Sequence, residues 1–145
     1  MVLMSRETDY ALRALAELAI SPGLVSVRVL ADRTGIPTNY LRKIMQRLLQ
    51  NRLVTSRQGP FGGYRLRRNP RAITFRQVME AAGGRIDVSA CRSDPELCPH
   101  VPTCALRKQL MKLQGEIDGW TTRRKLADIV LEPQAAGSRN RTPSS

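Results

Sequence analysis

The sequence predicts a mainly α-helical protein, built as a winged helix-turn-helix with a small β-hairpin wing and a long C-terminal dimerisation helix. Three observations predict this fold. Apolar residues recur at helical spacing in several short segments of the first 83 residues. A glycine-rich stretch then separates two short strand-like runs. Finally, Lys and Arg concentrate in the same part of the chain.

The basic residues form a block instead of being spread along the chain. The 145 residues carry a formal net charge of +12, and residues 28–76 hold twelve Lys or Arg but a single acid, Asp32. A basic block on one part of a folded chain is typical of a surface that binds a polyanion, because each phosphate that it neutralises releases condensed counterions. We therefore expect double-stranded DNA as the partner, since a merely solvated surface would more often mix both signs.

The first helix is expected over residues 5–20. Leu12, Leu15 and Ala19 recur at three- and four-residue spacing and predict one buried face, and Ser5 is a suitable N-cap. A Ser-Pro-Gly sequence follows and ends the helix.

A second and a third helix are expected next, joined by a tight turn. The second follows Ser26 as its N-cap and stops at Gly35, and the third runs from about Thr38 to Asn51. A helix, a turn with glycine, and a helix with amide and guanidinium groups on its exposed side form the pattern of a helix-turn-helix. The apolar face of the third helix would consist of Tyr40, Leu41, Ile44, Leu48 and Leu49.

The segment after the third helix predicts the wing. Residues 53–57 and 64–67 are strand-like, and the glycine-rich residues 58–63 between them suit a hairpin turn flanked by arginines. A basic hairpin placed directly after a helix-turn-helix indicates a winged helix.

The third helix and the wing together supply the predicted DNA contacts. Side chains of the helix are expected in the major groove, where Arg42 or Asn39 would carry base specificity. Lys43 and Arg47 are expected to anchor phosphates, and residues near the wing to approach the backbone or the minor groove. The full set is Thr38, Asn39, Tyr40, Arg42, Lys43, Arg47, Arg57, Gln58 and Arg65.

The three cysteines of the chain, Cys91, Cys98 and Cys104, lie within fourteen positions, in a stretch that also holds three prolines. An odd number of thiols cannot all pair as internal disulfides, whereas three thiols on one stiff loop supply three soft ligands to a metal centre. The cysteines therefore predict a metal or iron–sulfur site. The simpler alternatives are one disulfide with a spare thiol, or three reduced structural cysteines.

Two other kinds of site would use the same residues. The single histidine, His100, lies among the cysteines and would complete a closed tetrahedral zinc site with them. A disulfide between Cys98 and Cys104 would instead give a redox switch without metal. The sequence carries neither a nucleophile elbow nor a paired-carboxylate signature, so we expect no enzyme.

Helical spacing returns after the cysteines. From Ala105 on, Leu106, Leu110, Leu113 and Ile117 form a two-heptad seam. A chain this small has few other elements against which to bury the seam, so we expect a homodimer. No apolar run reaches the length of a signal peptide or a membrane span, so we expect a cytoplasmic protein with no membrane partner.

These expectations divide the chain into four parts. Thr74 is expected to cap a last helix of the winged domain, which would close at Gly83 and Gly84. The parts are a winged helix-turn-helix domain (1–83), a cysteine-containing cluster-binding loop (84–104), a dimerisation helix with a C-terminal packing segment (105–131) and a disordered tail (132–145).

Four motifs together resemble one known family. They are residues 8–15 (TDYALRAL), residues 35–41 (GIPTNYL), residues 59–66 (GPFGGYRL) and the three-cysteine loop. In this order they resemble the bacterial winged-helix regulators that include NsrR, IscR and RirA, over residues 1–131. The resemblance implies a homodimeric transcription factor, by default a repressor, with a 2Fe-2S or 4Fe-4S cluster on the three cysteines. Its DNA binding would change when nitric oxide, a redox change or a change in iron or cluster status acts on the cluster.

An iron–sulfur cluster needs a fourth ligand, or a substitute for one, beyond three thiolates. The resemblance offers Asp9, which stands where the nitric-oxide-sensing members place an aspartate contributed by the other subunit of the dimer. The member that regulates cluster assembly places a histidine three residues after the last cysteine, and Arg107 occupies that position here. His100 is the alternative fourth ligand within the loop.

Overall fold

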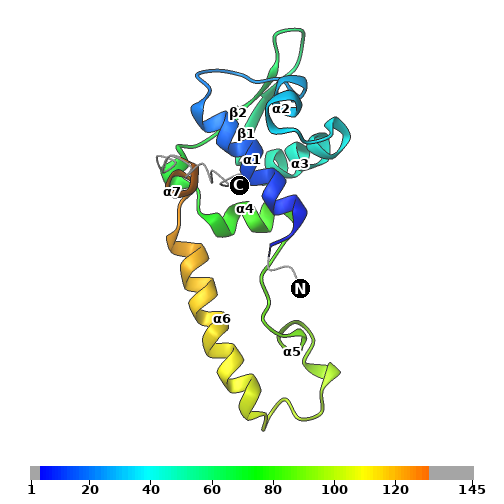
Figure 1. Ribbon diagram of the computed structural model, residues 1–145, viewed down its shortest axis with the longest axis vertical. Coiled ribbons are helices and arrows are strands. Elements are labelled where there is room, and N and C mark those ends of the chain that lie inside the picture. The colour runs from blue at the N-terminus through cyan, green and yellow to red at the C-terminus, as the bar shows by residue number, and fades with distance from the viewer. Residues whose placement is uncertain (1–3, 131–145) are drawn as a thin grey trace, which may run out of the picture.

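The computed structural model describes residues 4–130, and the predicted disordered tail lies outside them. The molecule has two regions (Figure 1): a body of short helices and one hairpin, and an arm that extends from it and contains one long helix. We call residues 4–83 and 124–130 the body and residues 84–123 the arm. The predicted fold class, mainly helical with a winged helix-turn-helix and a small two-stranded hairpin, is confirmed.

The elements follow one another in this order: α1 (Arg6–Ile20), α2 (Val27–Thr34), α3 (Thr38–Gln50), β1 (Val54–Arg57), β2 (Gly63–Leu66), the 3₁₀ turn η1 (Pro70–Ala72), α4 (Phe75–Ala82), α5 (Ala90–Ser93), the 3₁₀ turn η2 (Pro95–Leu97), α6 (Ala105–Arg123) and α7 (Leu126–Val130).

The first two helices begin and end where their capping residues predict. The Ser5 side chain accepts a hydrogen bond from the Thr8 amide at 3.2 Å, and Ser26 accepts one from the Val29 amide at 3.2 Å. Gly35 ends α2 with a φ of 71°, in the left-handed region that a residue without Cβ adopts at no steric cost. Each serine cap stabilises its helix by about 1 kcal/mol.

Apolar side chains from the helices of the body meet in one core. Leu15 of α1, Leu30 of α2 and Leu48 of α3 are fully buried in it, and so is Leu126 of α7. Burial of such a side chain contributes about 1.5–3 kcal/mol. The last helix therefore belongs to the body by its packing, although the whole arm separates it in sequence from α4.

The buried faces differ in detail from those that the sequence predicts. In α1, Leu12 and Ala19 are only half-buried. In α3, Met45 is fully buried although it was not expected in the core, because it follows Ile44 by one residue and the apolar stripe is wider than a strict three-four spacing. Tyr40 was expected on the apolar face but is 51% exposed, with its ring edge-on to Tyr10.

The hairpin is tied to the rest of the body along β2. β1 and β2 are antiparallel, with Val54 opposite Leu66 and Arg57 opposite Gly63. Tyr64 of β2 also pairs with Val25 just before α2, through two backbone hydrogen bonds of 2.8 Å. This pairing fixes the direction in which the hairpin leaves the body.

The arm leaves the body at one end of α4 and returns at the other. Thr74 caps α4 in a capping box with Gln77, as predicted for its N-cap, and Gly83 ends the helix with a φ of 89°. The chain returns where the Phe75 amide donates to the Arg124 carbonyl at 2.9 Å. Both attachment points of the arm therefore lie on a helix of eight residues.

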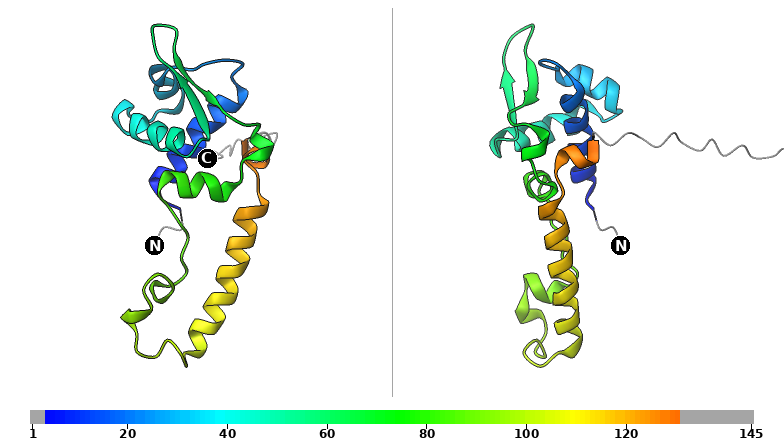
Figure 2. Two further views of the ribbon diagram at one scale, coloured as in Figure 1. Left: turned by 180° about the vertical axis from the view of Figure 1, so that it is seen from behind. Right: turned by 90° about the vertical axis from the view of Figure 1, so that its left-hand side faces the viewer.

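Figures 1 and 2 show the arm as two limbs, the segment that contains α5 and helix α6, which extend from the body and join at its far end. The segment expected as an irregular loop contains two short helical turns, α5 and η2, before α6 begins. At its body end, α6 is held by Trp120, whose ring lies edge-on to that of Phe75 at 5.5 Å between centroids. Of residues 84–123, all of them described, two are buried, Gln114 and Thr121, and both are polar.

Candidate DNA-binding face and cysteine loop

All nine predicted DNA-contacting residues are exposed in the structure. Six lie on α3 and three on or next to the hairpin, so they come from two neighbouring elements of one face. α3 presents them because its apolar side chains are drawn into the core, which turns Asn39, Arg42 and Lys43 outward. The sequence pattern of α3 therefore places its polar side chains as a helix-turn-helix requires.

A groove of about 550 Å³ separates α3 from the hairpin. Arg42 and Gln46 line it from α3, and Arg57 lines it from β1. Gln46 was not among the predicted DNA contacts, although its position one turn after Arg42 puts it on the same helix face. The groove thus brings together two guanidinium groups and an amide, which are groups that hydrogen-bond base edges and phosphates.

The hairpin carries basic residues on the face turned away from the core. Thr55, Arg57 and Arg65 line one shallow pocket there with Leu24 and Ser56. Strand alternation explains the arrangement, because Thr55 and Arg65 are cross-strand partners and Arg57 lies two residues further along the same face.

Arg47 has a contact within the body that the sequence did not indicate. Its guanidinium Nη1 donates a hydrogen bond of 2.9 Å to the carbonyl oxygen of Ala82, at the C-terminal end of α4. A Cβ on the next residue, Gly83, would lie 3.2 Å from the same nitrogen. Arg47 therefore joins the end of α3 to the point at which the arm begins, and its predicted phosphate contact would have to come from its remaining donors.

The three cysteines are half-buried on the arm, and none is in a disulfide. Cys104 is the N-cap of α6, where its sulfur accepts a hydrogen bond from the Arg107 amide at 3.4 Å. Cys91 lies in α5 with its sulfur 3.0 Å from the Ser89 hydroxyl, and Cys98 follows η2. Within residues 4–130, no three Cys, His, Asp or Glu side chains lie close enough together to hold a metal ion.

The two predicted fourth ligands lie in different regions. Asp9 is in the first turn of α1, on the body, where its carboxylate forms an ion pair of 3.0 Å with Arg13. His100 is exposed on the arm between Cys98 and Cys104. In the described fold neither residue groups with the cysteines as a set of metal ligands.

A buried glutamine fastens the start of the cysteine loop to α6. Gln114, with 2% of its surface exposed, accepts a hydrogen bond from the Val88 amide at 2.9 Å and donates one to the Ile86 carbonyl at 2.8 Å. Its amide also donates to Asp118 at 2.9 Å. Arg92 extends the connection by pairing with Asp118 at 3.2 Å and with Asp87. We call Gln114, Asp118, Arg92 and Asp87 the polar clamp.

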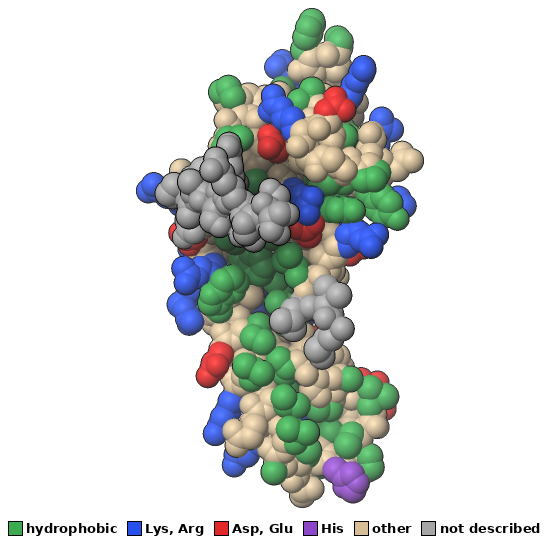
Figure 3. Space-filling model, in the orientation of Figure 1, with side chains coloured by type: hydrophobic (Ala, Val, Ile, Leu, Met, Phe, Trp, Pro, Cys, Tyr) green, Lys and Arg blue, Asp and Glu red, His purple; other side chains and the backbone are tan. Residues whose placement is uncertain are grey.

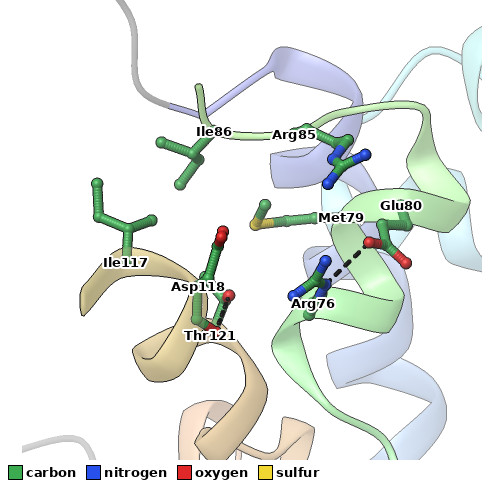
Figure 4. Close-up of a pocket in the computed structure, with 8 residues that line it drawn as sticks. All are labelled: Arg76, Met79, Glu80, Arg85, Ile86, Ile117, Asp118 and Thr121. Carbon is green, nitrogen blue, oxygen red and sulfur yellow. Dashed lines mark hydrogen bonds and ion pairs between the residues drawn. The ribbon is translucent and has the colours of Figure 1, made fainter. Parts of the chain in front are cut away.

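A small pocket lies between α4, the start of the arm and α6 (Figure 4). Met79 and Ile117 form its apolar part, and Arg76 and Asp118 lie on its polar side. The hydrogen bond that Arg76 makes with Glu80, together with the negative charge of that carboxylate, raises the pKa of Arg76 above its ordinary value. Arg76 therefore keeps a positive charge on this side of the pocket.

Arg107 carries an unsatisfied hydrogen-bond donor. Among the described residues, its Nε is buried without a hydrogen-bond partner. A buried donor that lacks an acceptor costs about 1–3 kcal/mol. The residue type of Arg107 does not indicate this unpartnered donor, because burial of one side-chain atom depends on the folded structure.

The sequence is similar to one protein family and to individual proteins. The model of one family, described as Rrf2, an iron-dependent transcriptional regulator, matches residues 4–132. The HTH-type transcriptional regulator IscR of Serratia proteamaculans is 30% identical over 123 residues, which are 83% of this chain and 74% of that protein. The HTH-type transcriptional regulator ORF2 of Azotobacter vinelandii, so named, is 34% identical over 123 residues. These are 83% of this chain and 74% of that protein.

Solved structures share the fold. The structure of CymR, titled the global cysteine regulator of B. subtilis, has a TM-score of 0.74 at 24% identity, over 92% of this chain and 99% of that one. The structure of T. potens IscR has a TM-score of 0.66 at 24% identity, over 99% and 94%. Among the helices described here, none is long and apolar enough to cross a membrane.

Proposed function

The chain belongs to the Rrf2 family of transcriptional regulators, and from this premise we propose that it is a DNA-binding repressor controlled by an iron–sulfur cluster on Cys91, Cys98 and Cys104. The observation that carries the proposal is the set of three free thiols on the arm. Thiolates are the usual protein ligands of such clusters.

Two features of the loop support a cluster by their chemistry. Cys104 stands at the N-terminus of α6, where the helix dipole favours a negatively charged ligand. The unpartnered Nε of Arg107 lies three residues further on, and cluster sulfurs accept hydrogen bonds. When bound, the cluster would supply a redox-sensitive centre that small molecules such as nitric oxide can modify. The sulfurs do not converge in the described fold, so the loop would have to close around the cluster.

Asp9 is proposed as the fourth ligand, contributed by the second subunit of a homodimer. Its ion pair with Arg13 is within reach of solvent, with 35% of the Asp9 side chain and 56% of the Arg13 side chain exposed, so giving it up costs little. The homodimer is supported by α6, where Leu106 and Leu113 are 66% and 46% exposed although they belong to the heptad seam. Figure 3 shows hydrophobic side chains gathered along this face of the arm.

The contact between Arg47 and the Ala82 carbonyl supports a route from the arm to the DNA-binding face. A movement of the arm about Gly83 and Gly84 would act on the end of α3 through this hydrogen bond. In a dimer, such a movement would change the distance between the two copies of α3. Operator half-sites have a fixed spacing, so the affinity for DNA would change.

On DNA, Arg42 or Asn39 would read bases in the major groove, and Lys43 and Arg47 would hold phosphates. Replacing Arg42 by Ala is expected to weaken binding to the cognate duplex far more than to a scrambled one. Equal loss on both duplexes would remove Arg42 from base recognition. Replacing Lys43 by Ala is the matched control, because a phosphate contact is lost equally on both duplexes.

The cluster is tested by the colour and metal content of protein purified without oxygen. Brown protein with iron and acid-labile sulfide is the expected result, and the Cys98→Ala variant should be colourless. Asp9→Ala should alter the visible spectrum, whereas Glu7→Ala, an acid in the same turn, should not. An unchanged spectrum for Asp9→Ala would leave His100 as the candidate within the loop.

A second candidate function is a regulator that senses through its thiols without iron. It is favoured by one observation: in the described fold the three cysteines are free and do not group as metal ligands. A disulfide between Cys98 and Cys104 predicts colourless protein whose DNA affinity responds to thiol reductants and not to chelators. A structural zinc site with His100 predicts colourless protein that contains zinc and loses its fold in chelator.

A further inference from the structure

Phe61 is the most exposed large hydrophobic residue of the part of the chain that the structure describes, with 93% of its surface accessible. A single exposed apolar side chain is ordinary on a protein surface. The location of Phe61 is unusual, because the residue lies at the tip of the hairpin between β1 and β2. Hydrophobic side chains mark the top of the molecule in Figure 3, where the hairpin of Figure 1 ends.

The tip holds Phe61 in a defined position. The Gly62 amide donates to the Gly59 carbonyl at 3.0 Å, which closes a β-turn with Pro60 and Phe61 as its central residues. The ring of Pro60 fixes φ at the first of these positions. A Cβ on Gly62 would collide with the carbonyl oxygen of Arg57, so the turn fits closely against β1. Only the two side-chain torsions of Phe61 remain to be ordered when it meets a partner.

The hairpin is anchored beside basic residues. The pairing of Tyr64 with Val25 joins β2 to the segment before α2. The groove between the hairpin and α3 is lined by Arg42 of α3 and Arg57 of β1. No Asp or Glu occurs between residues 33 and 79, so α3 and the hairpin carry charge of one sign. A surface of that sign is attracted to phosphates, and two rows of phosphates flank the minor groove of DNA.

We propose that Phe61 is an apolar wedge that enters the minor groove of the operator and partly unstacks one base step. The inference rests on the proposed DNA binding and adds a residue that reads the deformability of the duplex. Proteins that place apolar side chains between base steps kink the duplex there, and pyrimidine–purine steps unstack most easily. The chain would therefore prefer a TA or CA/TG step at the position that each wing reaches.

The alternative to DNA is a protein partner that binds Phe61. Ile20 and Val29 line a groove of about 690 Å³ together with Phe61, so the tip also borders an apolar surface. The hairpin itself and α3 beside it carry Arg and Lys but no acid, and this favours DNA. The experiment is designed so that a protein partner gives a different result.

The test uses the full chain and a duplex selected by it from a random 30-base-pair library. Affinity is measured at several salt concentrations for the unmodified protein, Phe61→Ala, Phe61→Trp and the control Ile20→Ala, which removes an exposed apolar side chain of the same groove outside the hairpin. Phe61→Ala is expected to bind about tenfold or more weakly, with an unchanged slope of affinity against salt because no phosphate contact is lost. Phe61→Trp and Ile20→Ala should bind like the unmodified protein.

Two further readouts address the wedge itself. A 2-aminopurine at the selected pyrimidine–purine step should brighten when the unmodified protein binds and stay dim with Phe61→Ala. Selection repeated with Phe61→Ala should lose the preference for that step. Equal thermal midpoints for the four proteins would show that the fold is intact.

Three results would overturn the proposal. One is a Phe61→Ala protein with full affinity and an unchanged step preference. Another is a loss of affinity with a shallower salt slope, which would mean that the hairpin lost a phosphate contact instead. The third is intact DNA affinity with altered transcription in a purified assay, which would assign Phe61 to a protein partner. If the unmodified protein selects no duplex, the proposed DNA binding fails, and that result is distinct from all three.

Discussion

The body and the arm are held together by opposite kinds of interaction. The body buries leucines from four of its helices in one apolar core, and its exposed face is basic. The arm buries only Gln114 and Thr121 among its own residues, and its leucines remain largely outside. In the body the apolar groups are inside and the polar groups outside, whereas in the arm this order is reversed.

The difference indicates which region folds by itself. A buried apolar core supplies most of the stability of a small domain, and the body has one. The stability of the arm depends on the hydrogen bonds of the polar clamp and on the partner that buries the apolar face of α6. A region of this kind opens more easily than a packed core, as switching elements require.

The largest expected effect contrasts one leucine of each region. Leu48→Ala removes a fully buried side chain of the body and should lower the free energy of unfolding by about 2–5 kcal/mol. Leu113→Ala, in α6, should leave the unfolding of the dilute protein nearly unchanged and weaken self-association, measured by sedimentation equilibrium. Lys112→Ala is the exposed control on the same helix. A large loss of stability of the dilute protein in Leu113→Ala would contradict the distinction between the regions.

A smaller effect is expected from the polar clamp. Gln114→Leu keeps a side chain of similar size but leaves the Val88 amide and the Ile86 carbonyl without partners, at a cost of about 1–3 kcal/mol. The cost should fall on the arm alone. Amide hydrogen exchange should therefore speed up around Val88, while the amides of α3 keep their protection. Faster exchange throughout the body would show that the two regions unfold together.

Gln114 also shows what sequence reasoning could not find. The caps at Ser5, Ser26 and Thr74 were predictable because each depends on groups within three residues. The partners of Gln114 come from 26 and 28 residues away, and nothing in its neighbourhood in the sequence marks it.

The same limit applies to Arg47. The sequence predicts a DNA contact for its side chain, because Arg47 lies on the polar face of α3. Its acceptor in the fold, the Ala82 carbonyl, becomes available only once α4 packs across α3. The groove that joins Arg42 to Arg57 likewise depends on where the hairpin folds, although the residue types on both sides were predicted from the sequence.

The helix between the two attachment points should show a still smaller effect. Thr74→Ala removes the side-chain acceptor of the α4 capping box and should cost about 1 kcal/mol. Chemical denaturation measures this loss, and Thr74→Ser, which retains the hydroxyl, should recover most of it. A full loss in Thr74→Ser would mean that the threonine methyl group matters and not the cap.

The smallest effect is expected from an ion pair on the surface. Arg76 and Glu80 are one helical turn apart on α4 and exposed to solvent. Solvent and salt screen such a pair, so Glu80→Gln should change the thermal midpoint less than Thr74→Ala does. The carboxylate of Glu80 raises the pKa of Arg76 further above neutral pH, so the guanidinium stays charged there. A change in midpoint that exceeds the effect of Thr74→Ala would show that α4 depends on this pair.

The path of the chain around α4 has a consequence for evolution and for protein engineering. The arm starts just after this helix and ends beside its first residue, so its two ends are separated by the length of eight helical residues, about 12 Å. A linker of about four to six residues would span that distance. The forty residues between can therefore be regarded as an insert. Removing them and joining Gly83 to Arg124 through such a linker should leave a miniature DNA-binding module that no longer responds to any signal. Inserts of other lengths and chemistries could be exchanged at the same two points.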